Sequence, residues 1–175
     1  MSDKLKQIIN KQAEQQDAGL DQSDDIVQLV GFVIGEEEYA VPILAIQEII
    51  KPFSWTRCPQ VPPYVLGVFN LRGTVIPLID LRVKFGLPTK NHNDETRFFV
   101  LKQGDEVAGF VIDRLTMAIR IKKENIGPAP ETISGDDTMI DGVGKQEDRI
   151  ITILKVDKLL AVSYTHLTLP TKRIV

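Results

Sequence analysis

Side chains that perform nucleophilic or metal chemistry are scarce in this sequence. Cys58 is the only cysteine, and His92 and His166 are the only histidines. A nucleophilic thiol needs a nearby base that lowers its pKa, and a zinc site needs about four Cys, His or carboxylate ligands at suitable spacing. Cys58 precedes Pro59 in a predicted loop, and the two histidines lie far apart. We therefore interpret Cys58 as a small packing residue and expect neither catalysis nor a zinc site.

Two further segments have the residue types of an ion or phosphate site but not the spacing. Asp136, Asp137 and Asp141 lack the ligand spacing of a calcium loop, so we expect a solvated loop. Residues 142–145 read GVGK, without the longer spacing and the Ser or Thr of a phosphate loop. We interpret them as a hairpin turn. The sequence thus predicts no enzyme, no cofactor and no metal.

Two charged residues fit recognition better than catalysis. Arg72 lies in a three-residue turn between two apolar runs, where a planar guanidinium suits bidentate binding of a carboxylate. Glu48 lies in a segment that we expect to be a helix opened by Pro42, with a buried stripe of isoleucines at 43, 46, 49 and 50. Two solvated charges remain an equally good interpretation from spacing alone. A patterned chain without a catalytic constellation is typical of a binding module.

Charge and composition exclude several classes of protein. The chain has 175 residues and a net charge of −3, and its polar leader (residues 1–25) holds three lysines and six acidic residues. The densest basic cluster, Arg120, Lys122 and Lys123, is better explained as a solvated strand end than as a nucleic-acid site. No apolar run approaches the roughly 18 residues of a membrane span, and no secretory signal opens the chain. We expect a cytoplasmic protein that neither binds nucleic acid nor inserts into a membrane.

Elsewhere the pattern is mainly β. Apolar, β-branched runs separated by Gly, Asn and Asp predict hairpins, and Leu115, Met117, Ile119 and Ile121 alternate with smaller or charged residues as in a half-buried strand. Pro77 predicts an edge strand or a bulge. The expected strands cover residues 26–34, 38–41, 67–70, 74–80, 96–102, 107–113, 115–122, 139–143 and 150–156. Short helices are expected at 80–85, capped by Asp80, and at 158–160, capped by Asp157.

The pattern of the first half restarts in the second half. The first copy is Gly67-Val68 followed by the apolar run that ends at Asp80. The second copy is Gly142-Val143 followed by the apolar run that ends at Asp157. We therefore predict a mainly β fold: two similar five-stranded SH3-like barrel lobes, about 26–88 and 94–160, packed on a shared core with a few short helices. Exchange of terminal elements between the lobes is left open.

Five motifs in order give the sequence a family resemblance. They are GEEEYAVPI with IQEI (35–43, 46–49), GVFNLRG with VIPLIDL (67–73, 75–81), VID (111–113), IGPAP (126–130) and LKVDKLL (154–160). Together they resemble the bacterial chemotaxis coupling proteins of the CheW type, over residues 27–161. Such a set is far more specific than any single motif.

The resemblance implies a non-catalytic adaptor of a two-component signalling system. Family members join the regulatory domain of a chemotaxis histidine kinase to the cytoplasmic tip of methyl-accepting chemoreceptors, and they help build receptor arrays. Carried over by motif, Arg72 and Glu48 match positions tied to coupling, and Ile46 and Ala118 match apolar receptor-contact positions. Ala118 is smaller than the usual aliphatic residue and implies a shallower contact. Three family glycines, Gly67, Gly73 and Gly109, are expected to serve the backbone.

Two alternatives and one departure from the family remain. The chain could be a regulatory domain cut from the kinase itself, although it holds no phosphotransfer or ATP-binding segment and Met1 opens a polar leader. An oligonucleotide-binding barrel would need basic strands interleaved with exposed aromatics. Residues 163–175 match neither a helix nor the acidic tail expected of the family, and resemble a translated adaptor sequence; a genuine short tail is the alternative.

Overall fold

Eleven strands and a few short helices make up the described part of the chain. The computed structural model describes residues 25–129 and 139–161. The leader, the tail at 163–175, His166, Asp136 and Asp137 lie outside the described residues. The elements are β1 (Ile26–Ile34), β2 (Glu37–Pro42), η1 (Ile43–Ala45), β3 (Ile46–Ile50), β4 (Val65–Leu71), β5 (Thr74–Asp80), α2 (Leu81–Lys84), β6 (Arg97–Gln103), β7 (Glu106–Ile112), β8 (Arg114–Lys122), η2 (Lys123–Asn125), β9 (Ile126–Gly127), β10 (Ile140–Gln146) and β11 (Arg149–Leu154). Residues 156–161 are also helical.

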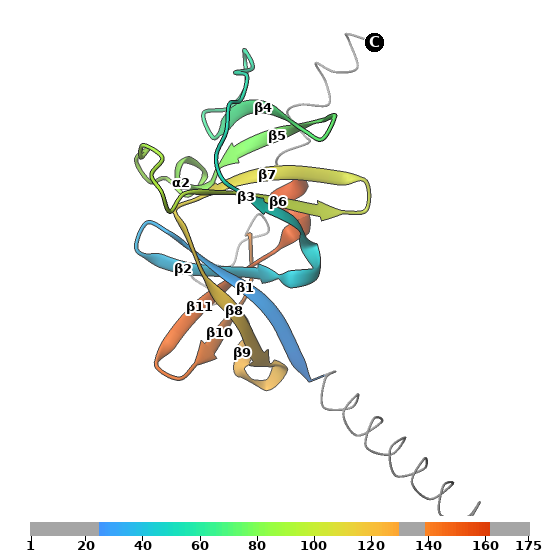
Figure 1. Ribbon diagram of the computed structural model, residues 1–175. Coiled ribbons are helices and arrows are strands. Elements are labelled where there is room, and N and C mark those ends of the chain that lie inside the picture. The colour runs from blue at the N-terminus through green and yellow to red at the C-terminus, as the bar shows by residue number, and fades with distance from the viewer. Residues whose placement is uncertain (1–24, 130–138, 162–175) are drawn as a thin grey trace, which may run out of the picture.

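The strands form two curved sheets, one above the other in Figure 1. The first lobe is the six-stranded sheet β8-β1-β2-β11-β10-β9, and the second lobe is the five-stranded sheet β3-β6-β7-β5-β4. The mainly β fold with two lobes is therefore confirmed, although the two-residue strand β9 gives the first lobe a sixth strand.

The lobes do not divide the chain at residues 88–94 as the sequence suggested. The second lobe is the continuous stretch from β3 to β7, and the first lobe combines β1 and β2 with β8 to β11. After the β1–β2 hairpin the chain crosses to pair β3 with β6, and after the β6–β7 hairpin it crosses back to pair β8 with β1. Relative to the predicted halves, β1 and β2 join the later strands and β6 and β7 join the earlier ones, so the second lobe is an insertion between β2 and β8 of the first.

The repeat that the sequence indicated is present in both lobes. The hairpins β4–β5 and β10–β11 carry a register shift in matching places, between Val65 and Gly67 and between Ile140 and Gly142. Each hairpin then joins its sheet through a parallel pairing, β5 with β7 and β11 with β2. The parallel pairing of β5 begins at Leu78. At Pro77, β5 is paired with β4 on one side and has not yet begun its pairing with β7 on the other. That local edge suits a residue without an N–H.

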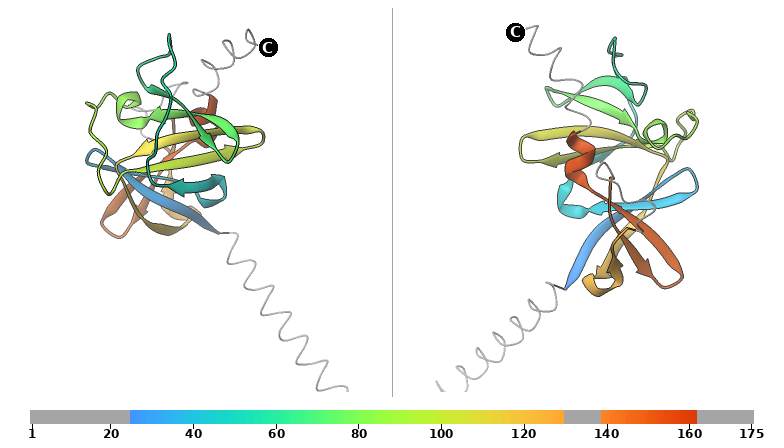
Figure 2. Two further views of the ribbon diagram at one scale, coloured as in Figure 1. Left: turned by 45° about the horizontal axis from the view of Figure 1, so that its top comes forward. Right: turned by 180° about the vertical axis from the view of Figure 1, so that it is seen from behind.

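Three apolar clusters hold the fold together. One lies within the first lobe around Leu29, Ile121 and Ile153, and one lies within the second around Phe69 and Phe98. The largest cluster is shared: it joins residues of β1, β2 and β11 with residues of β4 to β7 and with the helical residues 156–161. Figure 2 shows that this helix, in orange-red, packs where the two lobes meet. Each lobe therefore covers apolar surface that the other would expose.

The prediction of a helix after Pro42 is wrong. The chain forms only the 3-10 turn η1 and then continues as strand β3. Isoleucines at 46, 49 and 50 match helical spacing, but β-branched side chains favour strands, and β6 offers β3 a partner. Ile46 and Glu48 consequently lie on a strand.

Three smaller expectations also need correction. Residues 142–145 form part of strand β10, and the turn follows them at Glu147, whose φ is 54°. In β8 the alternation holds for Ile119 and Ile121, which are buried, but Met117 is 55% exposed. The last helix begins at residue 156, so Asp157 lies inside its first turn and does not cap it. The cap at Asp80 is confirmed, since its side chain accepts a hydrogen bond from the Arg82 amide.

Candidate partner-binding site

The two charged residues singled out in the sequence meet in space. Arg72 Nη2 lies 2.8 Å from Glu48 Oε1. The side chain of Arg72 is 79% exposed and that of Glu48 is 24% exposed. An exposed ion pair of this kind contributes only about 0–1 kcal/mol to stability. The pair therefore presents a guanidinium with unused donors, held in place by a carboxylate, at the surface of the second lobe.

The β4–β5 turn holds Arg72 at the tip of its hairpin. Arg72 and Gly73 both have positive φ angles, 53° and 88°, which is the pattern of a type I′ turn. The Gly73 amide donates a hydrogen bond to Asn70 Oδ1 at 2.8 Å, which secures the turn from its own strand. A rigid turn of this kind aims the arginine outward and limits the conformational entropy lost on binding.

Glu48 reaches Arg72 because the second lobe curls on itself. Strands β3 and β4 stand at opposite edges of the sheet order, yet the ion pair joins β3 to the β4–β5 turn. Near the same edge, Thr56 pairs with Val68 of β4 through two backbone hydrogen bonds of 2.8 Å. These contacts close the barrel and bring together residues that the flat sheet order separates.

The three family glycines have separate structural reasons. At Gly67, where φ is +151°, a Cβ would lie 2.0 Å from the Thr56 carbonyl oxygen. At Gly109 a Cβ would lie 2.6 Å from the ring of Phe69. At Gly73 the space is open and only the φ of +88° favours glycine. Gly67 thus permits barrel closure, Gly109 permits core packing, and Gly73 forms the turn beside Arg72.

Ile46 and Ala118 lie on different lobes. Ile46 opens β3, is half-buried, and packs against the shared core. A register shift between Ile46 and Glu48 breaks the strand alternation, so Ile46 packs inward while Glu48 reaches Arg72. Ala118 is exposed on β8 and pairs with Val30, which also packs against the shared core. The structure therefore joins Glu48 with Arg72 and places Ile46 and Ala118 on either side of the lobe boundary.

An open groove lies beside the start of β3, and the sequence did not indicate the residues that line it. Its lining comes from the connection between β2 and β3, from Lys102 and Gln103 of the second lobe, and from Asp141 and residues 154–157 of the first lobe. Its apolar members are Pro42, Leu44, Ala45, Leu154 and Val156. Leu44 is 96% exposed. Leu44, within the apolar run at 43–46, was the available signal, but the predicted helix had its buried stripe at the isoleucines and gave Leu44 no role.

Elsewhere, the described residues carry little chemistry. Cys58 is partly buried on the connector between β3 and β4. In residues 25–129 and 139–161 there is no group of three or more His, Cys, Asp or Glu side chains that could hold a metal ion. Burial raises the pKa of Asp80, while hydrogen bonds from the amides of Arg82 and Val83 oppose the shift. That carboxylate caps α2 and serves the fold.

Two barrel lobes pack around a shared core, and one lobe is inserted in the chain of the other. With an exposed ion pair on one lobe and a groove between them, they define a class of two-lobed β-barrel binding modules. In the described ranges, no helix is long and apolar enough to cross a membrane. The CheW-like domain family matches residues 28–163, and the chain belongs to this family.

Named relatives agree with this assignment. The "Chemotaxis protein CheW" of Helicobacter pylori is 53% identical over 162 residues, which cover 91% of this chain and 98% of that protein. The protein of the same name from Bacillus subtilis is 35% identical, with 76% and 86% covered. The crystal structure of the scaffolding protein TtCheW from Thermoanaerobacter tengcongensis superposes with a TM-score of 0.70 at 31% identity, with 74% and 89% covered. Family and fold are therefore shown from both sequence and structure.

Proposed function

We propose that this protein is a non-catalytic chemotaxis adaptor that couples chemoreceptors to the chemotaxis histidine kinase. Relatives that match most of the chain are named chemotaxis proteins, and a structural neighbour is described as a scaffolding protein. The single observation that carries the proposal for the site is the exposed ion pair between Arg72 and Glu48. It gives the surface a directional charged group without adding appreciable stability.

The inter-lobe groove is the proposed seat of the receptor tip. Its apolar lining, with Leu44 almost fully exposed, suits the apolar stripe of an amphipathic helix. Two lysines and two aspartates in its lining add charges that can select the helix and its orientation: Lys102, Lys155, Asp141 and Asp157. Ile46 borders this segment and Ala118 extends the surface across the lobe boundary, where its small side chain makes a shallower contact. The receptor contact then involves both lobes.

The kinase regulatory domain is the proposed second partner, and it would meet edge strands outside the groove. Separate surfaces allow one adaptor to hold receptor and kinase at once, and repeated contacts of this kind build an array. In this proposal the protein works in the cytoplasm and reaches the membrane through the receptors.

Binding titrations test the proposal directly. We expect the full chain to bind the isolated kinase regulatory domain, and to bind a receptor hairpin tip without competition between the two. Failure to bind either partner from its own organism, by a chain with native circular dichroism, would contradict the proposal. Competition between them would contradict the assignment of separate surfaces while leaving the adaptor function in place.

A further inference from the structure

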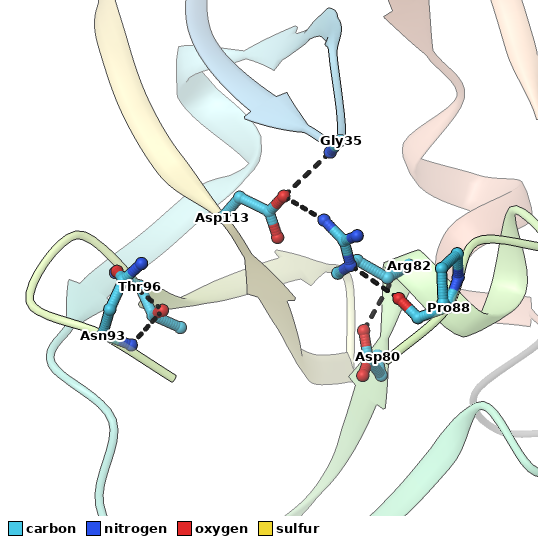
Figure 3. A network of polar contacts seen from close by, with 7 residues as sticks. All are labelled: Gly35, Asp80, Arg82, Pro88, Asn93, Thr96 and Asp113. Carbon is cyan, nitrogen blue, oxygen red and sulfur yellow. Dashed lines mark hydrogen bonds and ion pairs between the residues drawn. The ribbon is translucent and has the colours of Figure 1, made fainter. Parts of the chain in front are cut away.

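A single carboxylate gathers three elements at the junction of the lobes. Asp113 lies between β7 and β8, at the point where the chain crosses from the second lobe to the first. Its Oδ2 accepts a hydrogen bond from the Gly35 amide at 2.8 Å and one from Arg82 Nη1 at 2.5 Å (Figure 3). The Asp113 amide donates to the Val33 carbonyl at 3.1 Å. Gly35 and Val33 belong to the β1–β2 hairpin of the first lobe.

Arg82 reaches this carboxylate from the second lobe. It lies in α2, directly after β5, and its amide is held by the Asp80 cap. Its Nε donates to the Pro88 carbonyl at 2.9 Å, which fixes the guanidinium plane between two acceptors. The side chains of Arg82 and Asp113 are only 15% and 13% exposed. Asp113 therefore joins α2 of the second lobe to the β1–β2 hairpin of the first through a largely buried carboxylate.

Stability alone is a weak explanation for this pair. Removing two charges from water carries a large desolvation cost, and replacing a buried ion pair with uncharged residues is often neutral or stabilising. The shared core already holds the lobes together through apolar contacts among residues such as Phe32, Phe99 and Phe110. Apolar contacts are non-directional, whereas a guanidinium fork accepts only a narrow range of geometries.

We propose that Arg82 and Asp113 are positioning residues that set the orientation of one lobe relative to the other. The inter-lobe groove is lined from both lobes, and Ala118 lies on the opposite lobe from Ile46, Glu48 and Arg72. A fixed angle between the lobes keeps these residues in one arrangement. The inference concerns the free protein and does not rest on the identity of its partners.

The test compares lobe orientation in solution without any partner. Residual dipolar couplings of backbone N–H groups are measured on the isotope-labelled full chain, and an alignment tensor is fitted separately to the amides of each lobe. The main variant is Arg82→Met with Asp113→Asn, which removes both charges together. The side-chain amide that replaces the carboxylate keeps an oxygen that can accept from the Gly35 amide, so no buried charge or backbone amide is left without a partner.

Two further variants sharpen the comparison. Arg82→Lys keeps the positive charge and loses the fork, so it separates charge from geometry while preserving the fold. Arg97→Met is the matched control, because the hydrogen bonds of Arg97 within the described residues go to the nearby carbonyls of Asp94 and Thr96 in the second lobe.

The wild type and Arg97→Met should each fit one common tensor for both lobes. The double variant should lose that common tensor, with the tensors of the two lobes rotated or differing in magnitude, while each lobe still fits its own coordinates. Arg82→Lys should show the same loss to a smaller degree. If every folded variant fitted one tensor for both lobes, as the wild type does, the proposal would be overturned. If the double variant failed to fold, the same comparison between Arg82→Lys and the wild type would decide.

Discussion

At the scale of single residues, the charged pair and the lone thiol have different surroundings. Arg72 is tied to Glu48 but remains 79% exposed, so its guanidinium is available to a partner. Cys58 is partly buried on a connector, and no described cluster of metal-ligating side chains surrounds it. The sequence indicated Arg72 as a recognition residue because it lies in a turn between two apolar runs. It could not predict the contact with Glu48, because that contact depends on closure of the barrel.

We expect Arg72→Ala to weaken receptor control of the kinase without unfolding the chain. The lost ion pair is exposed, so the free energy of unfolding should fall by less than about 1 kcal/mol. Kinase activity in reconstituted arrays and urea denaturation measure the two effects. Lys145→Ala, at an exposed position of β10 near the β10–β11 turn, also removes one positive charge; it is the control and should change neither. Unchanged coupling in Arg72→Ala would contradict the assignment of this residue.

Cys58→Ser should retain full coupling and a native fold. The thiol has no base or metal partner among the described residues, and serine has a similar volume. Kinase activation and circular dichroism are the measurements. A loss of coupling by a folded Cys58→Ser protein would show that the thiol acts in signalling.

The Asp80 carboxyl should make stability depend on pH in a defined direction. Burial raises its pKa above 3.8 in the folded state, so the native protein holds this proton more tightly than the unfolded chain. Its contribution is therefore most favourable at acid pH and declines as the pH rises through the raised pKa. The unfolding free energy of Asp80→Asn, relative to wild type, should rise from about pH 3 to about pH 7. A constant difference across this range would contradict the shift.

At the scale of elements, the sequence predicted the hairpins but not the two places where the chain passes from one lobe to the other. The turns at Gly35 and at Arg72 and Gly73 could be predicted because each contains a glycine, which tolerates positive φ. Strand β3 was mistaken for a helix because Pro42 and spaced isoleucines mimic a helical start. Its true conformation depends on β6, which lies about 50 residues further on. Local patterns specify elements well where partners are adjacent, and poorly where pairing is distant.

Barrel closure at Gly67 should be far more sensitive to a methyl group than the turn at Gly73. Gly67→Ala drives Cβ into the Thr56 carbonyl, so we expect a loss of about 3 kcal/mol or more in unfolding free energy. Gly73→Ala meets open space and strains only the backbone, at a cost of about 1–2 kcal/mol. Urea denaturation of both variants provides the comparison. Equal losses would argue against the close approach of Thr56 to β4.

At the scale of the whole molecule, the repeat was visible in the sequence, but the insertion of one lobe between β2 and β8 of the other was not. Two copies of a hairpin pattern do not reveal that β3 pairs with β6 and that β8 pairs with β1. The result is a shared core that neither lobe contains by itself. Because the shared core holds the two lobes against each other, residues from both can line one groove.

The second lobe should not fold when it is separated from the first. Residues 46–112 form its whole sheet, but Phe32, Ile34, Leu154 and Leu160 from outside this stretch complete the shared core. We expect a fragment of residues 43–114 to lack cooperative thermal unfolding and slowly exchanging amides. A fragment with native-like hydrogen-exchange protection would show that the lobes are independent.

The most direct test of the adaptor function is reconstitution of the signalling complex. Receptor tip fragments are assembled on a template with the histidine kinase, and autophosphorylation is measured with and without this protein. We expect strong activation that requires the protein and is reduced by Arg72→Ala. With partners from the same organism and a folded protein, kinase activity that is the same in its presence and absence would contradict the adaptor function.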